Sequence, residues 1–329
     1  MSIAKPFLLK PAGKDYLWGG SRLKTEFNKD ISMDPLAETW ECSTHPDGPS
    51  MAASGDYNGL SLSQILKDHP EYLGMYRGPA GELPILFKFI DAKNDLSVQV
   101  HPDDDYARKY ENGQLGKTEM WYVLDAEPGT KLVYGFSKSM EKEQLRSSLI
   151  DGTVEQYLNK IDIKKDDVFF IKAGTVHAIG AGALIIEIQE NSNLTYRMYD
   201  YNRKGQDGQL RELHVDKALE VADLKAMVQP SQLPYKTVYE SGATSQSLCQ
   251  CKYFKAERWD LKKESLSEPV VIEPDRQSFQ VFLCMAGNAI LEMEGGDSLN
   301  FMKGDCVFGP ADSVQIKIRG YGQFLRVKC

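Results

Sequence analysis

Two short extended segments within residues 97–121 constrain the fold more than any other stretch, because they place four polar side chains in pairs. The segments read SVQVH and LGKTEMW. Side chains two residues apart on a strand share one face, so Gln99 and His101 point the same way, and so do Lys117 and Glu119. If the two strands pair, an amide, an imidazole, an amine and a carboxylate converge on one surface. We therefore predict a metal site.

Many short strand-like segments with Gly, Pro and Asp turns run through the rest of the chain. Residues 84–91 form a continuous apolar strand, and residues 184–190 alternate in the pattern of a strand. Helical patterns at 61–75, 103–112 and 138–159 fall between strands as insertions. This arrangement predicts a mainly β fold of jelly-roll barrels with short helical insertions, rather than a parallel α/β sheet.

An internal repeat indicates two barrels of the same kind. Residues 164–179 resemble 302–317, and residues 119–126 resemble 279–286. The match places Gln315 opposite His177 and Phe279 opposite Glu119, so the second copy lacks the ligand-type side chains. We predict one barrel that binds metal and one that is structural.

The length of 329 residues also favours two domains, because a single hydrophobic core rarely grows that large. A Pro-, Ser-, Gln- and Thr-rich connector is predicted at about 230–245. The predicted domains are 1–235, a catalytic metal-binding barrel with the helical insertions, and 236–329, a degenerate barrel without metal ligands.

Composition excludes some partners. The net charge of −8 argues against a general nucleic-acid or membrane-surface binder, and no apolar run is long enough to span a bilayer. The first thirty residues contain no continuous apolar segment of a signal peptide. Six scattered cysteines are typical of reduced thiols, so we expect a cytoplasmic protein.

The metal site gains a second histidine from residues 166–180, where a strand, a turn and a return strand lead to His177. His101, Glu119 and His177 offer two nitrogens and a carboxylate, and Gln99 offers an amide oxygen. Zinc accepts such ligands and keeps a position open in catalytic sites, although iron, manganese or nickel would fit the same residue types.

Several cations accompany these ligands in the sequence. They are Lys88, Lys117, Arg197 and Arg203. Cations beside a metal suit a phosphorylated or carboxylated small molecule. Lys88 interrupts an apolar strand, so it either reaches solvent at the sheet edge or points into an anion-binding pocket.

Three long motifs carry a family resemblance. They read LPILFKFIDAKNDLSVQVHPDD, GKTEMWYVLDAEPG and AGTVHAIGAGALIIEIQENSNLTYRMYDYNR. The chain resembles type I mannose-6-phosphate isomerases of the cupin superfamily, in their short bacterial form, over nearly all of its first 215 residues. The C-terminal part is similar only in length and cupin character.

The resemblance implies an isomerase that interconverts mannose 6-phosphate and fructose 6-phosphate, usually with one zinc ion. The family's metal ligands fall on Gln99, His101, Glu119 and His177. Its functional lysine, glutamate and arginine fall on Lys117, Glu187 and Arg197. Asn193 stands where longer relatives carry an acidic residue, and their large helical domain is absent, so the groups that hold the phosphate are not carried over.

An aldose–ketose isomerase must move a proton between C1 and C2, which we expect to proceed through a cis-enediol with Lys117 or Glu187 as base. A lysine base needs a lowered pKa, and Glu187 has the alternative role of orienting a metal ligand. Arg197 would stabilise the enediolate or the phosphate. Two rival functions are a non-catalytic sugar-binding double cupin and another cupin metalloenzyme, such as an iron oxygenase.

Overall fold

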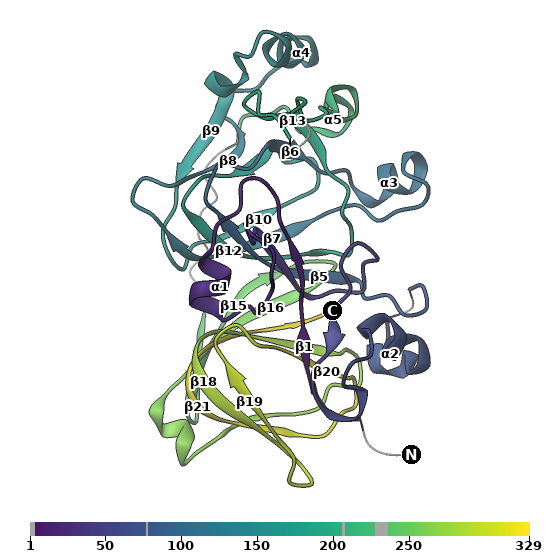
Figure 1. Cartoon of the computed structure of the whole chain (residues 1–329), viewed down its shortest axis with the longest axis vertical. Helices are drawn as coiled ribbons and strands as arrows, with labels where there is room; N and C mark the ends of the chain where they lie inside the picture. Colours follow the sequence, from purple (N-terminus) through teal and green to yellow (C-terminus); the bar gives the residue numbers. More distant parts are fainter. Residues whose placement is uncertain (1–3, 77, 206–207, 228–235) are drawn as a thin grey trace.

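The computed structural model describes residues 4–76, 78–205, 208–227 and 236–329. Two jelly-roll units of antiparallel strands lie one above the other along the long axis of the molecule, with the N-terminal unit at the top of Figure 1. This arrangement confirms the predicted mainly β fold with short helical insertions. No helix among the described residues is long and apolar enough to cross a membrane.

The N-terminal barrel consists of two facing sheets. The six-stranded sheet has the order β10 (Val168–Ile171), β7 (Glu119–Ala126), β12 (Ala183–Glu190), β5 (Ile85–Ala92), β3 (Glu38–Cys42) and β2 (Ala12–Lys14). The five-stranded sheet has the order β13 (Tyr196–Tyr199), β6 (Val98–Val100), β11 (His177–Ile179), β8 (Lys131–Phe136) and β9 (Leu158–Asp162). Apolar side chains from both sheets, including Trp121, Tyr134 and Ile185, fill the space between them.

The helices lie outside the barrels, as their insertion between strands predicts. The α-helices are α1 (Arg22–Phe27), α2 (Leu62–Asp68), α3 (Asp104–Tyr110), α4 (Lys142–Ile150) and α5 (Val215–Val221). The short 3₁₀ turns are η1 (Gly55–Tyr57), η2 (Pro70–Leu73), η3 (Val154–Tyr157) and η4 (Lys263–Leu266). Leu145 of α4 and Leu219 of α5 pack with Val98 and Val133 on the outer face of the five-stranded sheet.

The C-terminal barrel contains a ten-stranded sheet that also takes in the start of the chain. Its strands are β14 (Thr237–Glu240), β15 (Ala243–Gln250), β16 (Lys255–Leu261), β17 (Val270–Ile272), β18 (Gln280–Met293), β19 (Ser298–Met302), β20 (Cys306–Gly309), β21 (Ile316–Lys328), β1 (Phe7–Lys10) and β4 (Met51–Ala52). Phe7 of β1 is paired with Phe308 of β20. The first strand of the chain therefore lies in the sheet of the second barrel (Figure 1).

The predicted connector was partly wrong. Residues 230–235 lie outside the described residues, but 237–245 form β14 and the beginning of β15 rather than a loop. Polar residues with a period of two on an edge hairpin resemble a linker in composition, which explains the error. The domain boundary between 235 and 236 stays a prediction.

The two barrels share an apolar interface. On β12, Ile186 and Ile188 point away from their own barrel, while Ile185 points into it. The outward side chains pack against Val281 and Leu283 of β18 in one continuous core. The six-stranded sheet is therefore buried on both faces, and its outer face packs against the C-terminal barrel.

The strand register corrects the predicted match of Phe279 with Glu119. Val168 is paired with Tyr122 in the first barrel, whereas Cys306, its counterpart, is paired with Leu283 in the second. Counting back from these pairs places Gln280 opposite Glu119. Phe279 instead packs in the core between the barrels. A slip of one residue moves a side chain to the other face of a strand, and similarity of residue types alone does not reveal it.

The same slip affects the predicted match of Gln315 with His177. His177 is paired with Gln99, and the equivalent pair in the second barrel is Ile316 with Ile272, both in the barrel core. Gln315 is half-buried and lines a surface depression. The second barrel thus carries isoleucine where the first carries His177 and Gln99.

Candidate metal centre

Three ligand-type side chains converge inside the N-terminal barrel. His101 directly follows β6, Glu119 begins β7 and His177 begins β11. Their ligand atoms lie within 4.8 Å of one another, and all three residues are at most 1% exposed. From the sequence we considered that the strands carrying His101 and Glu119 pair with each other, and this was wrong. Strands β6 and β7 belong to facing sheets, so the two side chains meet across the barrel interior.

In both imidazole rings, Nε2 faces the other ring and carries no proton. Nδ1 of His101 lies 2.7 Å from the Leu194 carbonyl oxygen, and Nδ1 of His177 lies 2.8 Å from the Thr175 carbonyl oxygen. A carbonyl can only accept, so each Nδ1–H donates and each Nε2 keeps its lone pair. The two Nε2 atoms are 3.1 Å apart. Two lone pairs repel at this distance, and a cation bound by both would remove the repulsion.

Charge and burial keep both rings neutral, which is the form that binds metals. Burial lowers the pKa of His177 to about 4, and the Lys117 charge adds to this effect while the bond to Thr175 opposes it. Burial, followed by the Lys117 charge and the neighbouring His177 ring, holds the pKa of His101 well below its usual value.

The carboxylate of Glu119 completes the cluster. Its oxygens lie 3.6 Å from Nε2 of His101 and 3.4 Å from Nε2 of His177. Lys117 Nζ is 3.0 Å from Oε2, but neither buried oxygen accepts a well-formed hydrogen bond from the described residues. Burial and the Glu187 charge raise the pKa of Glu119 to about 7. A buried carboxylate in this position is costly unless it binds a cation, so the donor set fits a metal.

Gln99 lies in the same row of the five-stranded sheet. It is the register partner of His177 on β11 and of Arg197 on β13. Directly opposed residues on neighbouring strands share a face, so Gln99 lies between the histidine and the arginine. It also lines the adjoining cavity.

This cavity, of about 270 Å³, lies next to the cluster and is strongly polar. Its charged lining residues are Glu38, Lys88, Lys117, Glu187, Arg197 and Arg211. Lys88 is 4% exposed and points into the cavity, so the possibility that its amine reaches solvent was wrong. Arg203 is not among the lining residues; its guanidinium binds Asp200 and the Asp95 carbonyl instead.

Two glutamates and two lysines that line this cavity form a chain of alternating charges, in the order Glu38, Lys88, Glu187 and Lys117. Lys88 Nζ is 3.1 Å from Glu187 Oε1, and Lys117 Nζ is 3.7 Å from the same oxygen. Burial opposes ionisation of Glu187, but the charges of Lys117 and Lys88 and the Trp121 indole N–H, 3.0 Å away, outweigh it and lower its pKa to about 2. Burial likewise opposes the charge on Lys88, but Glu38 and Glu187 raise its pKa above the usual value.

Sequence reasoning missed Arg211, Glu38, Tyr16 and Trp18, which also line the cavity. Arg211 lies beyond the last family motif, on the segment that leads from β13 to α5. Its Nη1 is 3.3 Å from the Asp200 carboxylate, which also binds Arg203. No local pattern marks Arg211, because only the folded chain brings it to Arg197.

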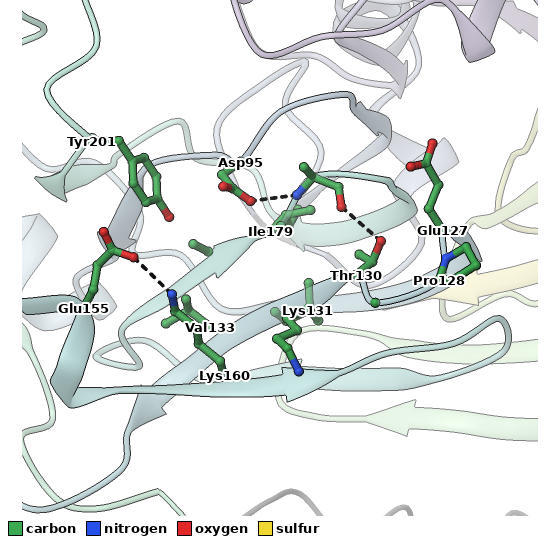
Figure 2. Close-up of a pocket in the computed structure, with 15 residues that line it drawn as sticks. Asp95, Glu127, Pro128, Thr130, Lys131, Val133, Glu155, Lys160, Ile179 and Tyr201 are labelled. Atoms are coloured by element: carbon green, nitrogen blue, oxygen red, sulfur yellow. Dashed lines mark hydrogen bonds and ion pairs between the residues drawn. The ribbon is translucent and has the colours of Figure 1, made fainter.

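A second cavity, of about 330 Å³, shares Ile179 as a lining residue with the first and is shown in Figure 2. Its polar groups are largely engaged with one another. Glu155 binds Lys160, Asp95 accepts the Ala181 N–H, and Thr130 donates to the Ala181 carbonyl (Figure 2). The described residues around it form no metal-ligand cluster, so the candidate site is the cavity beside His101 and His177.

Metal removal should destabilise the protein, because an ion that binds only the folded state adds to its stability. We expect a strong chelator to lower the midpoint of thermal unfolding by roughly 5 °C or more. Differential scanning calorimetry measures this shift. The Glu119→Gln variant is the matched control, and an equal chelator shift in that variant would show that the metal binds elsewhere.

Comparisons with known proteins agree with the geometry. Residues 7–128 match the family model of the phosphomannose isomerase type I catalytic domain, and residues 244–329 match that of the mannose-6-phosphate isomerase cupin domain. The mannose-6-phosphate isomerase ManA of Bacillus subtilis strain 168 is 34% identical over 320 residues, 97% of each chain. That of Streptococcus mutans is 36% identical over 259 residues, 79% of this chain and 80% of the relative.

Among solved structures, the crystal structure of the mannose 6-phosphate isomerase from Bacillus subtilis superimposes with a TM-score of 0.91 at 34% identity. The match covers 98% of this chain and 99% of that one. The fold of both barrels is therefore shared with this enzyme over nearly the whole chain.

Proposed function

The chain belongs to the type I family of mannose-6-phosphate isomerases, and on that premise we propose that it interconverts mannose 6-phosphate and fructose 6-phosphate in the cavity beside His101, Glu119 and His177. One observation carries the proposal: a buried His–Glu–His cluster adjoins, through Lys117, a cavity lined by four cations. Four cations near a cation-binding cluster suit a small sugar that carries a phosphate dianion.

Zinc is the proposed metal, one ion per chain. His101, Glu119 and His177 would hold it, with the Gln99 amide oxygen as a fourth ligand. When bound, a divalent cation supplies Lewis-acid stabilisation of negative charge on substrate oxygens. Two imidazole nitrogens and a carboxylate with room for substrate are typical of catalytic zinc.

Lys117 is the proposed base that moves the proton between C1 and C2. Its amine lines the cavity and lies 3.0 Å from Glu119 and 3.7 Å from Glu187. Glu187 is the less suitable base, because a carboxylate with a pKa of about 2 has little affinity for a proton. We propose that Glu187 instead holds Lys88, Lys117 and the Trp121 indole in place, and Trp121 in turn packs edge-on against the His177 ring.

Arg197 is the proposed partner of the substrate's anionic oxygens. Its Nη1 donates to the Glu212 carbonyl at 2.8 Å, whereas its Nε is buried and has no hydrogen-bond partner among the described residues. Burial lowers the pKa of Arg197, with Arg211 adding to the effect, yet a guanidinium stays charged at neutral pH. The arginine therefore has donor capacity left for an enediolate or phosphate oxygen.

Arg211 is proposed to bind the phosphate together with Arg197. Replacing Arg211 by alanine should raise KM for mannose 6-phosphate about tenfold and change kcat less than about twofold, because it removes charge distant from the reacting carbons. Steady-state kinetics measure both constants. The matched control is Arg108→Ala on α3, an exposed arginine outside the cavity, and an unchanged KM in the Arg211 variant would refute the assignment.

The direct test of the proposed function is to incubate the metal-loaded protein with mannose 6-phosphate and to measure fructose 6-phosphate. The proposal predicts multiple turnovers per chain. Binding of mannose 6-phosphate without product would instead favour the non-catalytic sugar-binding reading, and ferrous-dependent oxygen uptake would favour an oxygenase.

A cytoplasmic location is also proposed. All six cysteines are free, including Cys42 and Cys306 in the core. Free thiols throughout a chain are typical of a reducing compartment.

A further inference from the structure

Three consecutive backbone amides lead into Glu119, and each is anchored. The Gly116 N–H donates to Asp104 Oδ1 at 3.1 Å, and the Lys117 N–H donates to the Pro102 carbonyl at 3.0 Å. The Thr118 N–H donates to Glu190 Oε1 at 2.7 Å. Two of the three acceptors lie within three residues of His101. The positions of Lys117 and Glu119 relative to His101 therefore depend on these bonds.

The backbone of segment 116–118 packs tightly against that of segment 102–104 at Gly116. A Cβ placed on Gly116 would lie 2.4 Å from the Asp103 carbonyl carbon and 2.5 Å from the Asp104 nitrogen. Contacts below 3.0 Å with backbone atoms cannot be relieved by a side-chain rotation. Glycine at 116 is thus required for segment 102–104 to lie against segment 116–118.

The C-terminal barrel supplies the outer partners of this junction. The turn between β15 and β16 places Tyr253 Oη 3.0 Å and Lys252 Nζ 3.3 Å from Asp104 Oδ2. The turn is fixed by the bond from the Cys251 N–H to the Phe254 carbonyl at 3.0 Å, and the Phe254 side chain is buried in the core between the barrels. Tyr253 is therefore held in place by the second barrel while it binds the first.

Asp104 and Glu190 are also linked to each other. Burial and the Asp104 charge raise the pKa of Glu190 to about 8. Burial opposes ionisation of Asp104, but the Gly116 N–H, Glu190, Tyr253 and Lys252 outweigh it and lower the pKa of Asp104. These opposite shifts favour Glu190 as the donor and Asp104 as the acceptor of the hydrogen bond between the two carboxyl groups. Asp104 thus joins the Gly116 anchor to the C-terminal barrel, and Glu190 links the Thr118 anchor to Asp104.

We propose that Tyr253 of the C-terminal barrel is a positioning residue for the isomerase reaction, acting through Asp104 on the segment that carries Lys117 and Glu119. This inference rests on the proposed function, since it concerns the same site. It gives the barrel without metal ligands a role in catalysis: the second barrel fixes the entry of β7 into the metal centre.

A double-mutant cycle tests the proposal on the metal-loaded protein. Tyr253→Phe removes one hydroxyl and should lower kcat about fivefold, with KM changed less than about twofold and metal content unchanged. Asp104→Ala should lower kcat about twentyfold. If Tyr253 acts through Asp104, the double variant should match Asp104→Ala. Effects that multiply in the double variant would overturn the proposal, because independent contacts add in free energy.

Three further variants complete the design. Tyr239→Phe, an exposed tyrosine on β14 of the same barrel, is the matched control and should retain the wild-type kcat. Asp104→Asn keeps an acceptor for the Gly116 N–H and should recover part of the activity lost in Asp104→Ala. If Asp104→Ala does not fold, Lys252→Met/Tyr253→Phe decides: about a tenfold loss of kcat supports the proposal, and a wild-type kcat refutes it.

An assay of the wild-type protein distinguishes a failure of this proposal from a failure of the proposed function. Absence of fructose 6-phosphate from metal-loaded wild-type protein would refute the isomerase assignment itself. Normal wild-type turnover with unaffected Tyr253 variants would refute only the role of the second barrel.

Discussion

Replacing His177 by alanine should abolish isomerase turnover and metal binding together. We expect kcat/KM to fall at least about a thousandfold, because the remaining proposed ligands, His101, Glu119 and the Gln99 amide, should bind a divalent cation too weakly for catalysis. The physical basis is the pair of bare Nε2 atoms 3.1 Å apart, each fixed by a backbone carbonyl on the far side of its ring. Metal analysis of the purified variant and a mannose 6-phosphate assay measure the two effects.

The matched control for this variant is His69→Ala. His69 stacks on Tyr72 beside η2, away from the cluster. The His69→Ala variant should keep its bound metal and the wild-type turnover. A His177→Ala protein that binds metal as the wild type does, or that turns over normally, would show that the cluster is not the catalytic centre.

The second large effect is expected for Arg197→Ala. This variant should keep a full complement of metal and yet lose about a hundredfold in kcat, because the arginine is proposed to donate to substrate oxygens and is not part of the His101–Glu119–His177 cluster found among the described residues. Its buried Nε has no hydrogen-bond partner among the described residues, as expected for a donor reserved for a ligand. Steady-state kinetics combined with metal analysis separate this outcome from a loss of the metal site.

Arg108→Ala on α3 serves as the control, since that arginine is exposed and pairs with Asp105. If the Arg197 variant retains both metal and full turnover, the arginine has no role in the reaction. If the Arg197 variant loses its metal, the arginine supports the metal cluster rather than the substrate.

Local periodicity predicted the strands well because each strand has two chemically different faces. On β12, the alternation of Ile186 and Ile188 with Ile185 and Glu187 corresponds to the inter-barrel core on one side and the barrel interior on the other. The same reasoning placed Gln99 and His101 on one face, and the structure brings His101 to Glu119 and His177. Short-range spacing was sufficient to find these candidate ligands.

Long-range geometry was not available from spacing. Nothing in the sequence indicates that β6 and β7 lie on facing sheets, so convergence was predicted correctly but through the wrong contact. The internal repeat was recognised, yet its register was off by one, because hydrophobic residues occupy both faces of strands that are buried on both sides.

Contacts between the two barrels could not be predicted from the sequence either. Tyr253 and Asp104 are 149 residues apart, and neither belongs to a recognisable ligand pattern. Arg211 likewise reaches the cavity only through the folded path of the chain after β13. Residues that act through tertiary contacts carry no periodic signal, so only the structure identifies them.

Isomerase turnover as a function of bound zinc tests the central claim most directly. Metal-depleted protein is titrated with Zn²⁺, and fructose 6-phosphate formation from mannose 6-phosphate is measured at each step. A site formed by His101, Glu119 and His177 predicts no turnover without metal and a linear rise to a plateau at about one ion per chain. Full turnover in the metal-free protein, or no turnover at one bound ion per chain, would contradict it.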